Sequence, residues 1–502
     1  MPVRSFTRRQ FLKGTAVGAL GLGCAPTWLR AGANAATRPN VLLVFPDQLR
    51  FDWTGFTAGL PVRTPNLVRL AEEGMRFDRA YCPSPLCAPS RASLATGRAY
   101  GRTGVATNKD ILADVETVYT RLRDAGYRVG STGKLDLRKP AYSWGPDGQH
   151  RVDGRHYFRE WGFTDGLDSE GKGDTLKGGT RLREPIGPYM KMLRDRGDGS
   201  LERYIQWREN RRRAGRPAPN YSYTEPVQIA DELYNDNWVG RQALELLTEF
   251  PTNQPWFLQV NFPGPHAPMD VTPAMKAWYR DTTFPLPLNN TELTPEEHQE
   301  TRRAYSAMVE NIDHWLGRYL DELERRGELD RTLVVFSSDH GDMLGDHGQW
   351  GKRSPLQPSV SVPLVMRGPD VRRGATHRGA VSTLDLTATF LDYAGAAALP
   401  EMDCRSLRPL LRAGGAAEPT LATAGYGGWR MVTDGRYKLI RGFNPAAVSR
   451  TDYDGDDDDA AAGESERSPV LFDLDNDPHE QTDVAARLPD IVARLEKHLP
   501  IA

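Results

Sequence analysis

The sequence predicts an α/β protein with a central, mostly parallel sheet and a smaller C-terminal α+β subdomain that carries an antiparallel sheet. Three observations support this fold class. Four short apolar runs are continuous and not alternating, as in strands that are buried on both faces. Helical patterns lie between these runs, and the character of the chain changes near residue 400. Strands that alternate with helices favour a parallel sheet covered by helices.

The predicted strands of the central sheet occupy residues 39–48, 126–134, 255–266 and 331–342. Each run ends in polar residues, such as "PDQ" after the first and "SSDHGD" after the last. Helices are predicted over 64–75, which begins with Thr-Pro and ends at Gly74, and over 304–327. Because ligands of such sheets bind outside the carboxyl ends of the strands, we expect the functional site there.

Two regions have a different character. Residues 141–223 are rich in Gly, Arg and Asp with little periodicity, so we expect long loops over the sheet, either for substrate specificity or as plain surface. Residues 428–443 and 469–478 predict antiparallel strands, and "DIVARLEKHL" predicts a closing helix. The acidic run 451–466 predicts a solvated or disordered loop. Calcium binding is the weaker alternative, because the ligand spacing of a calcium loop is absent.

The N-terminus has the pattern of an export signal. Arg8 and Arg9 form a twin-arginine pair, followed by a Gly/Ala/Leu run and by small residues up to Ala35. We predict a twin-arginine signal peptide over 1–35, the twin-arginine translocase as a partner, and a periplasmic or secreted protein. The alternative is an uncleaved anchor or a basic arm. Stable membrane insertion is not expected, because a span needs ~20 apolar residues.

Charge and cysteine content exclude two classes. Residues 1–35 carry five positive side chains and no negative one, so their removal lowers the formal charge from −2 to −7. The absence of a basic excess argues against nucleic acid as a partner and leaves local basic pockets for anionic substrates. Cleavage would leave Cys82, Cys87 and Cys404, an odd number that excludes a complete disulfide framework. Beyond the signal peptide we predict two parts of the chain, a large α/β domain at 36–400 and a smaller C-terminal subdomain at 401–502.

Two pairs of neighbouring polar residues follow predicted strands. Asp47 and Gln48 follow the first strand, and Asp339 and His340 follow the last. A lone Asp at a strand end is usually a cap or a turn former. Two such pairs in one crevice supply hard oxygen ligands and one imidazole, which favours a site for a divalent cation.

The stretch "CAPSRASLATGR", residues 87–98, resembles the signature of the type I formylglycine-dependent sulfatases, which belong to the alkaline-phosphatase-like superfamily. Further motifs follow the family in order, including "GYRVGSTGK", "PHAP", "SSDHGDMLGDHGQWGK" and "LFDLDNDPHEQTDVA". The resemblance implies an alkaline-phosphatase-like sandwich with its catalytic domain at 36–400. It also implies a sulfuric ester hydrolase that cleaves sulfate monoesters, with a sulfated small molecule or glycan as the substrate.

The resemblance implies that a formylglycine-generating system converts Cys87 to Cα-formylglycine. One hydroxyl of the hydrated aldehyde would attack sulfur, and the second would let sulfate leave as the carbonyl reforms. Pro89 and Ser90 suit the first turn of a helix, whose N-terminus presents free amides and positive potential to an anion. The alternative for an isolated cysteine is a small buried apolar residue.

Further roles follow from the matched motifs. The implied metal ligands are Asp47, Gln48, Cys87, Asp339 and His340, and the implied catalytic residues besides Cys87 are Arg91, Lys134, His266 and Lys352. His266 is the candidate acid for the departing alcohol. Asp136 stands where many sulfatases have a histidine and is a possible second-step base, while His347 is either a pocket residue or a structural one.

The implied cofactor is one divalent cation. Calcium is expected, although Gln48 and His340 lower the ligand charge and leave Mn²⁺ or Mg²⁺ open. Two other functions stay open from the sequence. A phosphonate or phosphate ester hydrolase could use the same scaffold, and a non-catalytic binder of sulfated glycans is expected if Cys87 stays unmodified.

Overall fold

The computed structural model describes residues 38–139, 142–175, 185–414, 420–443 and 468–500. The predicted signal peptide and the acidic run 451–466 lie outside these ranges. Among the described helices, none combines the length and the apolar character that crossing a bilayer would need.

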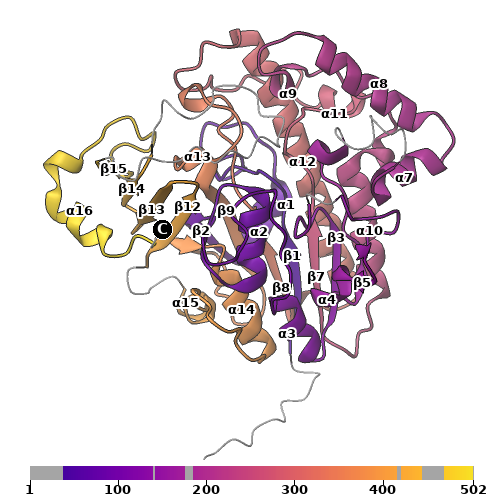
Figure 1. Cartoon of the computed structure of the whole chain (residues 1–502), viewed down its shortest axis with the longest axis horizontal. Coiled ribbons are helices and arrows are strands. Elements are labelled where there is room, and N and C mark those ends of the chain that lie inside the picture. The colour runs from indigo at the N-terminus through magenta and orange to yellow at the C-terminus, as the bar shows by residue number, and fades with distance from the viewer. Residues whose placement is uncertain (1–37, 140–141, 176–184, 415–419, 444–467, 501–502) are drawn as a thin grey trace, which may run out of the picture.

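A large mixed sheet with helices on both faces confirms the predicted fold class (Figure 1). Its strands, in spatial order, are β10 (Ala375–His377), β2 (Met75–Tyr81), β9 (Ser361–Arg367), β8 (Thr332–Phe336), β1 (Asn40–Val44), β7 (Trp256–Asn261), β3 (Arg128–Gly133) and β6 (Asp165–Gly166), and β11 (Val381–Ser382) also pairs with β2. Only β9 runs antiparallel to its neighbours β2 and β8. The carboxyl ends of β1, β7, β3 and β8 therefore meet at one edge.

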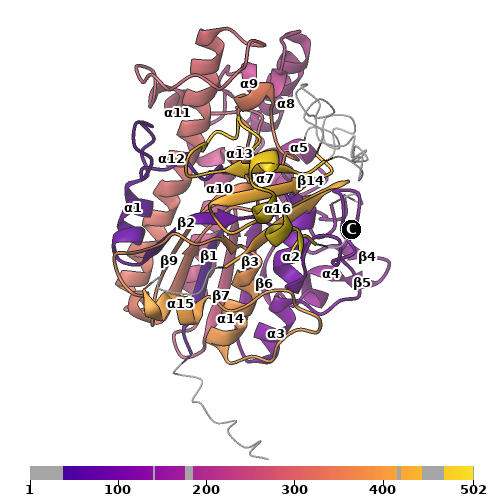
Figure 2. The same ribbon diagram turned by 90° about the vertical axis from the view of Figure 1, so that its left-hand side faces the viewer.

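Strand β1 explains why the sequence of the sheet is continuously apolar. Val41 and Leu43 belong to one core cluster, whereas Leu42 and Val44 belong to another on the opposite face. The first face is covered by α2 (Cys87–Thr96), α3 (Val118–Asp124) and α14 (Asp385–Ala394), and the second by α1 (Pro65–Glu72), α10 (Asn235–Glu249) and α12 (Pro295–Arg325) (Figure 2). Each buried aliphatic side chain contributes about 1.5–3 kcal/mol, so burial on both faces fixes β1 at the centre.

The C-terminal sheet packs on the same core. It comprises β12 (Ala422–Tyr426), β13 (Trp429–Thr433), β14 (Tyr437–Arg441) and β15 (Val470–Asp473), all antiparallel, with α15 (Arg408–Ala413) before it and η6 (Ala485–Arg487) and α16 (Pro489–Glu496) after it. Val432 and Leu439 face α16 through a small cluster of their own. Met431 and Ile440 point the other way and join the large core. The boundary between residues 400 and 401 stays a prediction.

The expectation of mere loops over 141–223 is wrong. The described part of this region contains β4 (Arg151–Val152), β5 (Arg155–His156), α4 (Tyr157–Glu160), α5 (Lys172–Asp174), α7 (Pro188–Asp195), α8 (Ser200–Arg213) and α9 (Pro219–Ser222). In α8 the buried Leu201, Tyr204 and Trp207 recur every three residues among arginines, of which Arg208 and Arg211 are also buried. Long arginine stems can cover apolar surface, so a polar composition concealed an amphipathic helix.

Short elements complete the chain, and one long helix begins earlier than predicted. The short elements are η3 (Asp231–Leu233), α11 (Pro273–Ala277), η4 (Leu329–Arg331), η5 (Asp346–Gly348) and α13 (Gln357–Val360). Helix α12 starts at Pro295 and not at 304, because Thr294 and Glu297 form a reciprocal capping box.

Glu170 caps α7 from inside the protein. Its fully buried carboxylate accepts hydrogen bonds from the amides of Met190 at 2.8 Å and Tyr189 at 3.4 Å. Burial raises the pKa of Glu170 to about 7, and the two amides only partly oppose this. The folded state therefore holds the proton more tightly than the unfolded chain. This contribution to stability is complete below the ordinary carboxyl pKa and is lost as pH rises through about 7.

Replacing Glu170 with Gln should remove this pH dependence, since an amide oxygen can still accept from the α7 amides. We expect Glu170→Gln to match the wild type near pH 5 and to exceed its unfolding free energy by about 2–3 kcal/mol at pH 8.5. Urea unfolding at both pH values measures this. Glu202→Gln, on the exposed side of α8, is the control and should shift neither curve. Equal pH dependence of Glu170→Gln and the wild type would contradict the assignment.

Candidate active site

Cys87 is the first residue of α2 and lies at the carboxyl edge of the central sheet. Its Sγ is 3.2 Å from His340 Nε2 and 3.5 Å from Asp47 Oδ1. Asp47 follows β1 by three residues and Asp339 follows β8 by three residues, so the parallel pairing of these strands brings both carboxylates to the helix. The amide of Ala88, next to Cys87, donates to Asn108 Oδ1 at 3.0 Å.

Four of the predicted metal ligands form one buried group. Ligand atoms of Asp47, Cys87, Asp339 and His340 all lie within 4.8 Å of one another. Gln48 lies beside this group, and its backbone N–H donates to Asp339 Oδ1 at 3.0 Å. Its side-chain Oε1 is buried without a hydrogen-bond partner. Two carboxylates, one imidazole and an unsatisfied amide oxygen fit a divalent cation.

Arg91 is fully buried and braces the site from behind. Its Nε donates to Asp339 Oδ2 at 2.9 Å, and its NH1 donates to Lys134 O at 2.6 Å and to Asn261 Oδ1 at 3.0 Å. These contacts join the ends of β8, β3 and β7. Arg91 therefore holds Asp339 in place and offsets its charge.

Two lysines approach the site from different loops. Lys134 follows β3 and forms an ion pair with Asp47 and a second with Asp136 at 3.1 Å. Lys352 Nζ lies 2.8 Å from Cys87 Sγ. Burial and Asp47 would raise the pKa of the Cys87 thiol, but Lys134, Lys352 and His340 lower it to about 5. The site thus favours a negative charge at the position of Sγ.

His266 lies behind Lys352. Its Nδ1 is 2.5 Å from the carbonyl oxygen of Ala267, which requires a proton on Nδ1. Nε2 therefore accepts from Lys352 Nζ at 3.0 Å. Burial, and then the charge of Lys352, hold the pKa of His266 well below its usual range. His266 is a neutral imidazole that contacts Cys87 only through Lys352.

The described contacts of Asp136 and His347 are with residues other than Cys87. Asp136 is buried with a left-handed backbone, φ 58°, and its carboxylate faces Lys134 and Lys139. No hydrogen bond joins Asp136 to Cys87 within the described chain. The backbone amide of His347 donates to Leu288 O at 2.7 Å, and the charges of Glu480 and Asp346 act on its imidazole. His347 thus lies toward the C-terminal subdomain.

Sequence reasoning missed several polar residues that contact the predicted site. They are Asn108, Tyr221, Asn261 and Asp342. Asp342 belongs to the quoted "SDHGD", so its position three residues after Asp339 was the available signal. Tyr221 lies on α9, inside the region expected to be loops, and no sequence signal pointed to it.

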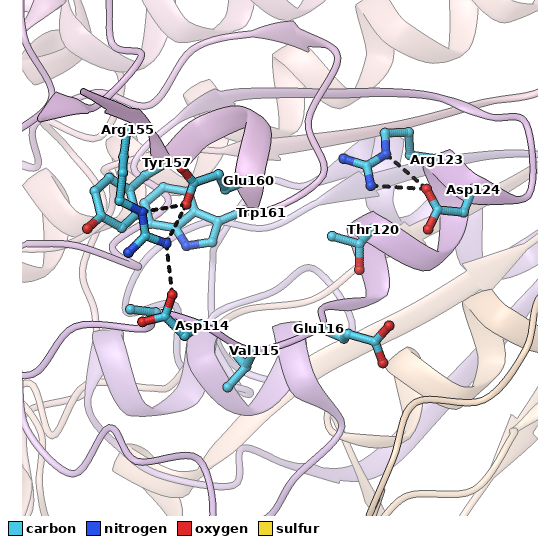
Figure 3. A pocket seen from close by; sticks show the side chains of 11 residues that line it. Asp114, Val115, Glu116, Thr120, Arg123, Asp124, Arg155, Tyr157, Glu160 and Trp161 are labelled. Carbon is cyan, nitrogen blue, oxygen red and sulfur yellow. Dashed lines mark hydrogen bonds and ion pairs between the residues drawn. The ribbon is translucent and has the colours of Figure 1, made fainter. Parts of the chain in front are cut away.

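A second depression lies elsewhere on the surface, beside α3 and α4 (Figure 3). Arg155 lies between Asp114 and Glu160 and donates to both, and Arg123 pairs with Asp124. The lining of this depression shares no residue with the Cys87 site. The ion pairs within it stabilise the local surface and give it no unbalanced cluster of charge.

Known proteins share this fold and sequence pattern. The family described as Sulfatase matches residues 39–396. An arylsulfatase of Clostridium perfringens is 26% identical, over 89% of this chain and 90% of its own length. An N-acetylglucosamine-6-O-sulfatase of Bacteroides thetaiotaomicron is also 26% identical, over 74% and 71%. A phosphonate monoester hydrolase of Agrobacterium radiobacter superposes with a TM-score of 0.71 at 22% identity, over 92% and 94%.

The mixed sheet thus shares its fold with that hydrolase. The family match then covers most of the chain, including every predicted ligand and catalytic residue. The chain belongs to the sulfatase family.

Proposed function

We propose that this protein is a sulfuric ester hydrolase that cleaves sulfate monoesters, with sulfated carbohydrate as the preferred class of substrate. One observation carries the proposal. Cys87 opens α2 within the buried group of Asp47, Asp339 and His340, and Lys352 contacts its sulfur. Anionic ligands are stabilised by helix N-termini and ammonium groups together.

The modification of Cys87 belongs to the proposal. Conversion to Cα-formylglycine would put a hydrated aldehyde where Sγ lies, and its second hydroxyl gives sulfate an exit that a serine ester lacks. A divalent cation held by Asp47, Gln48, Asp339 and His340 would make the attacking oxygen more acidic and offset charge on the sulfate. We propose Ca²⁺, with Mn²⁺ or Mg²⁺ as alternatives.

The side chains then divide the remaining work. Lys134 and Lys352 donate to the sulfate oxygens, and Arg91 keeps Asp339 fixed. The departing alcohol takes its proton from the Lys352–His266 pair, because Lys352 Nζ faces the reacting position and His266 Nε2 lies behind it. Asp136 contacts Lys134, so it can take a proton in the second step only through that lysine.

Location and processing are also proposed. Residues 1–35 carry the twin-arginine pattern, so export through the twin-arginine translocase into the periplasm or medium is proposed to follow modification of Cys87 in the cytoplasm.

The names of two relatives, an arylsulfatase and an N-acetylglucosamine-6-O-sulfatase, support sulfate esters as the substrate class.

The test compares two esters of one phenol, a sulfate and a phosphate, on protein whose residue 87 has been identified by peptide mass. We expect a loss of roughly 18 Da at Cys87 by atomic-mass arithmetic, and a higher kcat/KM on the sulfate. A much larger kcat/KM on the phosphate would instead favour a phosphate or phosphonate ester hydrolase. An unmodified thiol with no turnover would favour a binder of sulfated glycans.

A further inference from the structure

We propose that Asp342 and Tyr221 are positioning residues that fix the side-chain amide of Gln48 with its oxygen toward the metal site. This inference rests on the cation site of the proposed function. It adds a role for two residues outside the predicted ligand set, and it accounts for an amide at a position that requires only an oxygen.

The backbone of Gln48 is constrained first. Its conformation is left-handed, φ 67°, which costs free energy in a residue other than glycine and persists only when neighbours enforce it. The backbone N–H of Gln48 donates to Asp339 Oδ1 at 3.0 Å, and the backbone carbonyl of Gln48 accepts from the Tyr305 hydroxyl at 2.6 Å. The backbone is thereby held by the loop after β8 and by α12.

The side chain is constrained next. Nε2 donates to Asp342 Oδ2 at 2.7 Å and to the Tyr221 oxygen at 3.1 Å. The Tyr221 hydroxyl in turn donates to the same Oδ2 at 2.9 Å. These three groups therefore form a closed ring of hydrogen bonds. Within this ring the amide has one orientation, since a carbonyl oxygen in the place of Nε2 would face the carboxylate.

The one polar atom of Gln48 not yet accounted for is Oε1, which is buried and has no hydrogen-bond partner. A buried acceptor without a donor is costly unless a ligand satisfies it. Asp339 and Asp47 are immediate neighbours of this residue and belong to the metal-ligating group. The ring thus aims an uncharged oxygen at a site that already holds two carboxylates.

Both positioning residues are themselves held. The Asp342 Oδ1 accepts from the amide of Leu344 at 2.8 Å. The Tyr221 ring packs against Trp350 in a tilted arrangement with centroids 4.6 Å apart, and the Tyr221 carbonyl accepts from the Thr301 hydroxyl on α12. In Asp342→Asn a single oxygen would have to serve both Gln48 and Leu344, while the new NH₂ group would face one of these donors. The substitution therefore releases the amide without removing volume.

The test measures metal affinity, not turnover. Metal-stripped full-length protein is titrated with Ca²⁺ and with Mn²⁺ by calorimetry. We expect Asp342→Asn to raise Kd by about 10- to 100-fold and Tyr221→Phe by a smaller factor. In a Gln48→Ala background, Asp342→Asn should raise Kd no further, because the group it positions is gone. Gln48→Glu combined with Asp342→Asn should recover affinity, since the donor and acceptor are exchanged at constant charge.

Matched controls lie outside the site. Tyr319→Phe removes a buried hydroxyl that donates to Gly240 O, and Asp313→Asn alters a buried carboxylate that accepts from Leu67. Neither should change Kd. The proposal fails if Asp342→Asn leaves Kd within twofold, if it weakens binding equally in the Gln48→Ala background, or if the wild type binds neither cation. None of these outcomes depends on which ester the enzyme cleaves, so a failed sulfatase assay is a separate result.

Discussion

Cys87→Ala is expected to lower kcat/KM on a sulfate ester by about four orders of magnitude or more, and to leave the fold intact. The reason is the position of its Sγ, in contact with Lys352, His340 and Asp47. Removal of the side chain removes the proposed nucleophile, whereas helix α2 keeps its bond from Ala88 to Asn108. Steady-state kinetics and thermal unfolding of the purified variant measure the two effects.

Cys82 supplies the matched control. It is equally buried and lies five residues away, but it packs in the apolar core with Leu86. Burial raises the pKa of its thiol well above the usual range, so it stays neutral. We expect Cys82→Ala to lose about 1 kcal/mol of stability and little activity. If Cys82→Ala were inactive and Cys87→Ala active, the assignment of the nucleophile would be wrong.

The fold was predictable where one physical rule dominates. Strand β1 is apolar at four consecutive positions, from Val41 to Val44, because both of its faces are covered. Helix α8 was not predictable in the same way, because Arg208 and Arg211 are buried among its apolar residues. A search for apolar periodicity treats every arginine as polar. The aliphatic stem of an arginine can nevertheless be buried like an apolar side chain.

The site was predictable as far as local motifs reach. Cys87, Asp47 and Asp339 lie together because parallel strands end at one edge, which follows from the order of elements. Tyr221 contacts Gln48 across 173 positions of sequence, and only the packing of α9 against α12 brings it there. The neutral state of His266 also depends on a contact, with Lys352, that no motif describes.

Lys134→Met is expected to destabilise the protein by about 3–5 kcal/mol when a chelator removes cations, and to reduce activity about 100-fold or more when they are restored. Lys134 is buried and pairs with Asp47 and with Asp136. Without its ammonium group, two buried carboxylates lose their nearest cation. The pKa of each would then rise, because burial raises both values and Lys134 is the largest of the charges that lower them. Urea unfolding in a chelator measures the stability term.

A second substitution separates the stability of this charge cluster from its chemistry. Asparagine tolerates the left-handed backbone of Asp136 and removes one of the two carboxylates that lose their ion pair with Lys134. Lys134→Met with Asp136→Asn should therefore recover about 1–2 kcal/mol of the lost stability. Activity should stay low, because the donor to the sulfate oxygens is still missing. If the double variant regained activity as well as stability, Lys134 would serve only to neutralise Asp136. If the double variant were as unstable and as inactive as Lys134→Met alone, the lost stability would come from Asp47.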